Sequence, residues 1–471
     1  MIGVDSGRMA TTDHPPAVEL AEPGEYGDKV VAIEPGGIEP VPDADKHGRP
    51  IQLLWTWASP NLEFATVFVG ALAVFAFGLT FWQAVLAVLT GNLLGAITHA
   101  VLSARGPRYG VPQMVLSRLS FGYWGNLLPA GLNSLMAGVG WFAVNSVSGA
   151  FALNSLTGLP TLLCLVIVVV AQLTVAFFGH NLVHAFERYA LPLLAVVFLV
   201  GTVVVLARSS PSSAAGGGGL GGFLLTASAA FGYTAGWNPY AADYTRYLPA
   251  GVSHRAAGVY AGLGVFVSCT VLMIAGAASV TAGADYTGNP TTAYTGELPA
   301  VLSHLTLLCV AVGAVAANAI NVYSGALSFL CLNVRLSLAW RRAIVALLFG
   351  AVGFVLAWTA LPDAGHDYES FLLVIAYWVA PWLAVVLLDQ WLYRGRDDSP
   401  LLTSPAHHNW AGPIAMLVGL VASVALFSNQ QLYTGPVPEA VPSLGDITPA
   451  IGFAVAGLLY LVLRPLRPPV T

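Results

Sequence analysis

Apolar segments follow one another almost without interruption from Leu53 to Leu463. A chain that folds in water carries about 25% charged residues, because these residues face the solvent. Here only 9% of the 471 residues are charged and 56% are hydrophobic. The apolar excess must face lipid, which excludes a soluble globular enzyme. A net charge of -5 without a basic stripe also speaks against a nucleic-acid partner.

The apolar segments have the length of membrane-spanning helices, which need about 20 residues each. Twelve such segments lie near 53–79, 81–104, 124–153, 159–178, 184–207, 223–241, 257–282, 298–332, 338–361, 369–392, 410–427 and 448–464. Lys and Arg are retained on the cytoplasmic side of a membrane. If residues 1–52 lie inside and the segments alternate, every Lys and Arg except Arg208 is on that side. The sequence therefore predicts an all-α polytopic protein of the cell membrane, with twelve transmembrane helices and both termini in the cytoplasm.

Neither the N-terminal residues nor the cysteines nor any sequence motif predicts a catalytic or metal-binding site. Residues 1–52 are polar and lack an apolar signal segment, so we expect a disordered cytoplasmic tail rather than a cleaved leader. The four cysteines lie in or at the end of apolar segments and form no CxxC pair, which indicates buried thiols and no metal site. No nucleotide-binding, zinc-protease or serine-hydrolase motif is present, so we expect neither an enzyme nor a cofactor.

Two of the predicted helices contain an internal break. The first contains Pro60 within WASPN (57–61), and the sixth contains Pro239 within GWNPY (236–240). Proline removes a backbone donor, and in lipid the freed carbonyls need partners, so such breaks line cavities or are buried in protein. The two breaks correspond if 53–207 and 223–392 are inverted repeats followed by extra helices at 410–464. This pattern predicts a transporter site at the midplane, and the alternative is a pair of ordinary proline kinks.

Aromatic and amide side chains within the spans indicate what this site binds. Trp141 and Asn145 are four residues apart and share one helical face. A planar heterocycle would stack on an indole ring and pair with an amide. Trp237, at the second break, would supply the opposing face, and Asn318 and Asn321 add two more amides. The alternative is that these tryptophans pack the core and the asparagines join helices.

Few ionisable residues fall within the spans. A carboxylate inside the membrane is costly, so we expect it to have a functional role. Glu63 follows the first break, and burial would make it a candidate for carrying a proton. Asp243 follows the second break, three residues before Arg246. We expect these two to form a helix-end ion pair at the cytoplasmic gate.

Several motifs resemble those of the nucleobase-cation symporter family, specifically its purine-cytosine permease branch. The most specific is GWNPYAADYTRYLP at 236–249, and weaker matches are TGNLLG at 90–95, SRLSFG at 117–122, VGWF at 139–142 and NVYSGALS at 321–328. The resemblance covers about residues 50–465. It implies the leucine-transporter-type fold, with ten core helices in a five-plus-five inverted repeat and two more helices at the end. It also implies alternating access that couples an inward cation gradient to uptake of a nucleobase or related compound.

The resemblance also implies site residues. The helix-three aromatic and amide match Trp141 and Asn145, the helix-six aromatic matches Trp237, and the helix-eight amide matches Asn321. The helix-one polar contact matches Ser59, with Asn61 as a second candidate. Sodium-coupled relatives have adjacent hydroxyl residues a few positions before the helix-eight amide, where this chain reads VGAVA at 312–316. Because Na+ prefers oxygen ligands, we expect proton coupling.

The sequence thus predicts a symporter that imports a purine base or cytosine together with protons. The alternatives are Na+-coupled transport of a related heterocycle, such as hydantoin, allantoin, uracil or a vitamin pyrimidine, and a channel-like membrane protein. The residues do not rank the individual bases, because amides satisfy many donor and acceptor edges.

Overall fold

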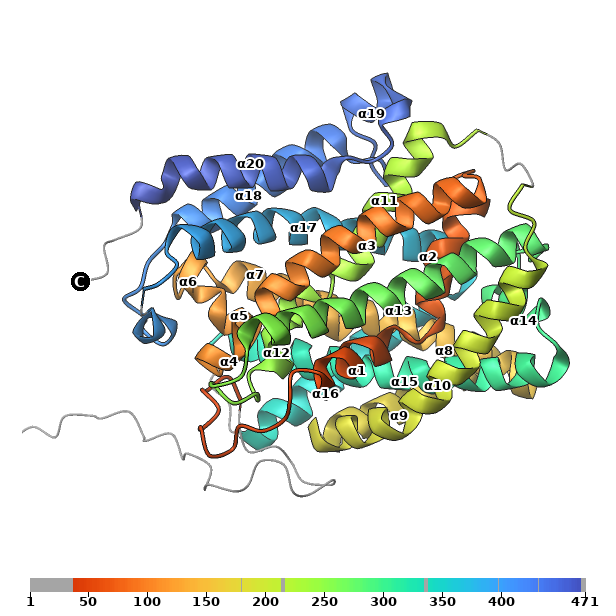
Figure 1. The fold of residues 1–471 in the computed structure, drawn as a ribbon, viewed down its shortest axis with the longest axis horizontal. Coiled ribbons are helices and arrows are strands. Elements are labelled where there is room, and N and C mark those ends of the chain that lie inside the picture. Colours follow the sequence, from red (N-terminus) through yellow and green to blue (C-terminus); the bar gives the residue numbers. More distant parts are fainter. Residues whose placement is uncertain are drawn as a thin grey trace, which may run out of the picture.

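The computed structural model describes residues 37–178, 180–212, 217–333, 338–396, 398–430 and 432–466, and the regular elements of these residues are helices (Figure 1). Outside them, two isolated bridges join Gly122 to His408 and Asn429 to Thr434. The expected all-α class is therefore confirmed for the described part of the chain. Most of the expected disordered tail, residues 1–36, lies outside it.

Each predicted apolar segment coincides with a helix or a broken helix. The long helices are α2 (Phe64–Phe75), α3 (Phe81–Ser103), α8 (Phe142–Thr157), α9 (Thr161–Phe178), α10 (His180–Arg208), α11 (Gly219–Ala235), α13 (His254–Ala282), α15 (Ala300–Leu330), α16 (Leu338–Ala360), α17 (Ala364–Leu392), α18 (Ala411–Phe427) and α20 (Thr448–Leu463). The short ones are α1 (Gln52–Ala58), α4 (Gly106–Tyr109), α5 (Gln113–Leu116), α6 (Arg118–Phe121), α7 (Leu127–Leu135), α12 (Ala241–Thr245), α14 (Pro290–Gly296) and α19 (Pro436–Ala440). By length and hydropathy, five spans in the described residues can cross a membrane, or six when bent α1 and α2 count as one.

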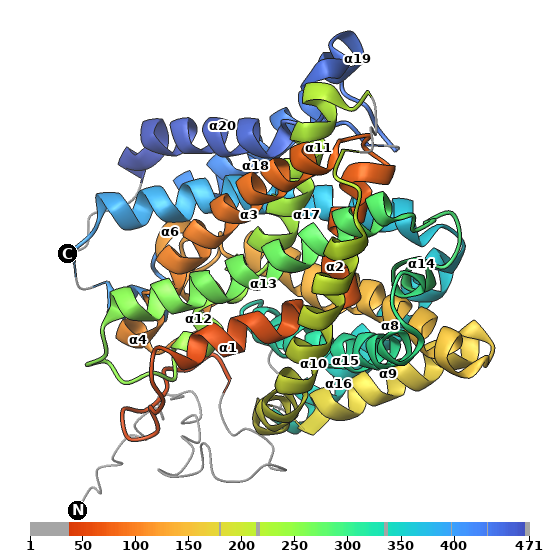
Figure 2. The same ribbon diagram turned by 45° about the vertical axis from the view of Figure 1, so that its right-hand side comes forward.

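The helices pack in two groups around the centre of the molecule. One group joins α1, α2, α3, α11 and α13, and the other joins α8, α9, α15 and α16. Helix α10 packs on both groups and crosses α13 and α15 steeply in Figure 2. Helices α18 and α20 pack on α17 at the periphery (Figure 1).

Glycines allow the helices of the first group to approach closely. A Cβ atom on Gly70 of α2 would lie 1.6 Å from the carbonyl oxygen of Met273 on α13. A Cβ atom on Gly276 of α13 would lie 1.8 Å from the carbonyl oxygen of Val67 on α2. Small residues permit this backbone contact between membrane helices. The contact holds the broken first helix rigidly against α13.

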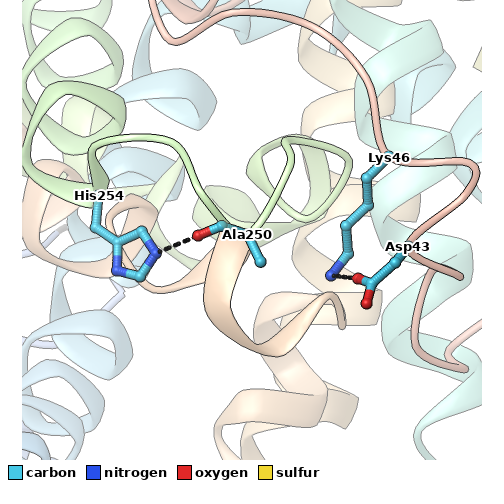
Figure 3. Close-up of polar contacts among 4 residues, drawn as sticks. All are labelled: Asp43, Lys46, Ala250 and His254. Carbon is cyan, nitrogen blue, oxygen red and sulfur yellow. Dashed lines mark hydrogen bonds and ion pairs between the residues drawn. The ribbon is translucent and has the colours of Figure 1, made fainter.

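Residues 37–51, which we call the N-segment, belong to the expected tail but pack on one end of the bundle. Their main chain forms hydrogen bonds from Val41 to Gly110 (2.9 Å) and from His47 to Tyr247 (2.7 Å). Figure 3 shows the ion pair of Lys46 with Asp43 (2.7 Å) near the loop that leads into α13. Lys46 holds the pKa of the exposed Asp43 carboxyl below its usual value. The part of the tail that the structure describes is therefore folded, because it satisfies main-chain groups at the helix ends.

Candidate functional site

Both predicted helix breaks are present, and they define the centre of the site. Helix α1 ends at Ala58, a single 3-10 turn covers Ser59–Asn61, and α2 leaves at an angle of 62°. Helix α11 ends at Ala235, and a second 3-10 turn, Asn238–Tyr240, leads into α12. Each turn has its proline near its start, where a missing N–H costs no helical hydrogen bond.

The two tryptophans predicted to stack on a substrate lie close to each other. The rings of Trp141 and Trp237 are nearly parallel, with an interplanar angle of 9° and centroids 6.2 Å apart. Both side chains are only 2% exposed. A planar ring between two indoles needs about 7 Å, since each van der Waals contact takes about 3.5 Å. The pair must therefore separate slightly to enclose a base.

Other aromatic rings fix the orientation of these indoles. Tyr233 and Phe371 stand edge-on to Trp141, each with a centroid distance of 5.2 Å. Trp57 stands edge-on to Trp237 at 6.1 Å. Edge-to-face contacts of this kind stabilise one ring orientation. The stacking faces are therefore held by packing before any substrate arrives.

Three asparagines form one hydrogen-bonded cluster beside the tryptophans. Asn145 on α8 and Asn321 on α15 both donate to Oδ1 of Asn318, at 2.9 and 3.4 Å. Asn318 in turn donates to the carbonyl oxygen of Phe142 at 2.9 Å. The Oδ1 atoms of Asn145 and Asn321 are buried and have no hydrogen-bond partner. Because an unpaired buried acceptor is costly, these two oxygens are suited to N–H groups of a ligand.

Replacing Asn318 by alanine is expected to raise the KM for uptake by about 5- to 150-fold, because each amide left without its partner costs about 1–3 kcal/mol. The measurement is initial-rate uptake of a labelled base in cells that express equal amounts of each variant. Asn154, near the end of α8, donates to the carbonyl oxygen of Leu159 and serves as the control. An unchanged KM in Asn318→Ala, matching Asn154→Ala, would remove the cluster from the site.

The helix-one candidates contact the protein itself. Asn61 accepts the indole N–H of Trp237 at 2.8 Å and donates to the carbonyl oxygen of Trp57 at 2.7 Å. Ser59 is buried, and its hydroxyl donates to the carbonyl oxygen of Thr56 at 3.4 Å. Asn61 therefore positions the Trp237 ring in this structure. Contact of either residue with substrate stays a prediction.

Glu63 caps the N-terminus of α2 and is only 1% exposed. Its carboxylate accepts the main-chain N–H of Ala65 and the hydroxyl of Tyr233, both at 3.1 Å. The Tyr233 hydroxyl also lies 2.5 Å from that of Thr66, and the Thr66 hydroxyl lies 2.7 Å from the carbonyl oxygen of Asn61. Tyr233 thus connects Glu63 to the ring of Trp141 and, through Thr66, to Asn61.

Sequence reasoning missed Tyr233. The available signal was its position, because Tyr233 lies only three residues before Gly236, where the predicted second break begins.

Asp243 and Arg246, the predicted gate pair, are both buried at the end of the bundle that carries the N-segment. Asp243 accepts the main-chain N–H of Gln113 at 2.8 Å. Arg246 donates to the carbonyl oxygen of Gly37 at 2.9 Å and to the hydroxyl of Tyr323 at 3.1 Å. Both residues therefore join helix six to other parts of this end, and the gate role itself stays a prediction.

Trp141 and Trp237, with Trp57, Tyr368 and Phe371 around them, form what we call the aromatic cage. A cavity of about 510 Å³ lies beside this cage. It is bordered by α2, α8, α16 and α17, and its lining includes Phe371 and Tyr368, which contact Trp141. Asp367, Gln430 and Leu432 line it as well. Tyr368 and Phe371 therefore contact both the cavity and the ring of Trp141.

The four cysteines are buried and unpaired, as predicted. Within the described residues, no three His, Cys, Asp or Glu side chains gather as a metal site.

Comparison with known proteins identifies the family. Residues 40–452 match the family model described as a permease for cytosine/purines, uracil, thiamine and allantoin. The chain belongs to this permease family. It is 30% identical to a putative purine-cytosine permease of Bacillus subtilis over 92% of this chain and 96% of that protein. It is 31% identical to the purine-cytosine permease fcyB of Emericella nidulans over 94% and 93% of the two chains. The predicted family and its purine-cytosine branch are therefore confirmed, and the protein is a multi-pass membrane transporter rather than an enzyme.

Solved structures confirm the fold of this permease. Mhp1, a nucleobase-cation-symport-1 family transporter, aligns in its inward-facing conformation with a TM-score of 0.68 and 19% identity, over 92% of this chain and 94% of Mhp1. Its closed conformation with bromovinylhydantoin bound gives a TM-score of 0.66 and 17% identity, over 91% and 95% of the two chains. The permease thus shares the fold of Mhp1.

Proposed function

We propose that this permease is a secondary active symporter that imports a purine base or cytosine together with protons. The observation that carries the proposal is the parallel pair of Trp141 and Trp237 beside two unpaired amide oxygens. Stacking on an aromatic ring suits every nucleobase, since each base has a π-face. The N–H groups of these bases would pair with the Oδ1 atoms of Asn145 and Asn321. The names of the two purine-cytosine permeases point to the same substrates.

The proposal includes the membrane topology predicted from the sequence. In this topology the protein spans the cell membrane twelve times, and both of its termini lie in the cytoplasm. The first ten spans form a five-plus-five inverted repeat, and two further helices follow. The N-segment then lies on the inner side, and the cavity beyond Phe371 opens toward the outside. In an alternating-access cycle the base enters from this cavity when Phe371 and Tyr368 move aside.

Proton coupling is supported by the contact between α15 and the first helix break. A Cβ atom on Gly313 would lie only 2.8 Å from the carbonyl oxygen of Leu62, so no hydroxyl side chain fits at this contact. The stretch 312–316, which carries no hydroxyl side chain to ligate Na+, thus approaches the first break closely at Gly313. Glu63 lies beside this contact and bonds through Tyr233 to the cage, so its protonation would alter the position of both indoles.

The test is uptake of labelled cytosine and of labelled hypoxanthine, each competed by a panel of unlabelled bases. We expect saturable accumulation that a protonophore abolishes and that proceeds without Na+. Competition only by hydantoin, allantoin, uracil or a vitamin pyrimidine would support the alternative substrates, since the family description includes uracil, thiamine and allantoin beside cytosine and purines. Uptake that requires Na+ and ignores the protonophore would contradict proton coupling, and non-saturable flux without accumulation would indicate a channel.

A further inference from the structure

The helix that carries Trp141 is not a regular α-helix where it reaches that residue. Between α7 and α8 the chain forms a π-turn, Met136–Trp141, of sequence MAGVGW. A π-turn closes its hydrogen bonds over five residues rather than four, so it takes up one residue more than an α-turn. Such turns are rare and often occur at functional sites. This one ends on a stacking residue of the aromatic cage, so its presence needs a physical reason.

The π-turn decides which face of the helix Trp141 and Asn145 occupy. They follow Asn133 by 8 and 12 residues. In an uninterrupted α-helix, at about 100° per residue, they would point about 80° and 120° away from Asn133. With one residue taken up by the π-turn, the effective separations are about 7 and 11 residues, which brings both directions within about 20° of Asn133. The π-turn therefore aligns the two cage residues with Asn133.

The contacts with α15 agree with this alignment. On the α7 side of the turn, Nδ2 of Asn133 donates to the hydroxyl of Ser328 at 2.7 Å. On the α8 side, Nδ2 of Asn145 donates to Oδ1 of Asn318 at 2.9 Å. Ser328 and Asn318 both belong to α15. The chain is thus bonded to the same neighbouring helix before and after the π-turn.

Two glycines in the turn receive aromatic rings from α16 and α17. A Cβ atom on Gly138 would lie 2.2 Å from Cδ2 of Phe349 on α16. A Cβ atom on Gly140 would lie 2.3 Å from Cε2 of Phe371 on α17. Phe371 in turn stands edge-on to Trp141. A side chain at either glycine would therefore push a ring away, and at position 140 that ring is one that orients Trp141.

We propose that the π-turn Met136–Trp141 positions the Trp141 ring in the aromatic cage, and that its two glycines keep the turn in place. The rings from α16 and α17 fill the space over Gly138 and Gly140, and so hold the turn between two helices. With the turn held, Trp141 stays parallel to Trp237 and can stack on a base. The turn is a positioning element, because it acts on the substrate through Trp141. This inference rests on the proposed function.

The first test is Gly140→Ala, measured as equilibrium binding of labelled cytosine or hypoxanthine to the purified permease. The added methyl group displaces Phe371, so binding must force Trp141 back into an overpacked position. We expect the Kd to rise by about 5- to 150-fold, the range that corresponds to overpacking of a buried site. Gly131→Ala on α7 is the matched control, because a Cβ atom there would lie no closer than 3.8 Å to its nearest neighbour outside the helix, Leu332.

Gly138→Ala tests the turn separately from the cage. Phe349 stands edge-on to Phe329 of α15 and lies outside the cage. A weakened affinity for the base in Gly138→Ala therefore reports movement of the turn itself. We expect its Kd to rise by about 5-fold or more.

Shortening the facing ring should relieve each defect. The double variants are Gly140→Ala with Phe371→Leu and Gly138→Ala with Phe349→Leu. In each pair the loss of affinity should be smaller than the product of the two single losses, by at least about 2-fold, because residues in contact are coupled. Where a glycine variant does not fold alone, recovery of folding in its double variant shows the same rescue, and failure of both would contradict the proposal.

A second readout needs no substrate. Hydrogen exchange of residues 136–145 reports local opening of the turn. It should be faster in Gly138→Ala and Gly140→Ala than in Gly131→Ala, and slower again in the double variants. Kd and exchange equal to those of Gly131→Ala, or single losses that simply multiply in the double variants, would overturn the inference. If wild type binds no base, the proposed function fails while hydrogen exchange still reports on the turn.

Discussion

Replacing Trp141 or Trp237 by alanine is expected to raise the Kd for the transported base by about 5- to 150-fold, because each stacking contact contributes about 1–3 kcal/mol. The two rings are parallel and buried, and in the proposed site each of them stacks on one face of the base. Trp237→Ala also removes the hydrogen bond to Asn61. The effect is measured as equilibrium binding of labelled base to purified variants.

Two further variants separate stacking from general disturbance. Trp237→Phe keeps an aromatic face but loses the N–H donor to Asn61, so we expect an affinity between those of wild type and Trp237→Ala. Trp82→Ala is the control, since the Trp82 side chain is 62% exposed and lies far from the cage in sequence. Wild-type affinity in both Trp141→Ala and Trp237→Ala would show that the base binds elsewhere.

Glu63→Gln is expected to abolish uphill accumulation while leaving exchange of base across the membrane. Glutamine can still accept the hydrogen bond from Ala65 with its single side-chain oxygen, and its amide N–H can donate to the Tyr233 hydroxyl, so the helix cap and the cage persist. The variant cannot gain or lose a proton, so the proton gradient no longer drives transport. The measurement is accumulation of labelled base in proteoliposomes with an imposed pH gradient, compared with counterflow in the absence of a gradient.

Glu439→Gln, at an exposed position of α19, is the control for loss of a carboxylate. Accumulation by Glu63→Gln equal to that of wild type would place proton coupling at another residue. Loss of both accumulation and counterflow with a lowered melting temperature would show that the carboxylate is needed for folding of the break.

The site residues divide by the kind of information that identifies them. Pro60 in the first break and Gly236 and Pro239 in the second act on the local backbone, so both breaks were predictable from the sequence. Trp141 and Asn145 share a helical face by their spacing alone. By contrast, the role of Asn61 as the acceptor for Trp237 depends on two helices that are distant in the chain. Tyr233 resembles an ordinary core residue until its partners in space are known.

The N-segment illustrates the same distinction. Its polar composition is typical of a disordered tail, yet residues 37–51 pack on the bundle through main-chain hydrogen bonds to Gly110 and Tyr247. Such bonds use groups that every residue carries, so composition does not reveal them. The buried side chain of Arg246, which donates to Gly37, completes this contact.

The sequence by itself determined that the chain lies in a membrane, where its helices run and where two of them break, because hydropathy and proline act over short stretches of chain. It also identified the family through motifs that surround the second break. Only the tertiary structure decided that the two indoles are parallel, that Asn318 holds two other amides, and that Glu63 reaches the cage through Tyr233. These facts depend on how distant helices pack, and close packing is a property of the whole fold rather than of any local pattern.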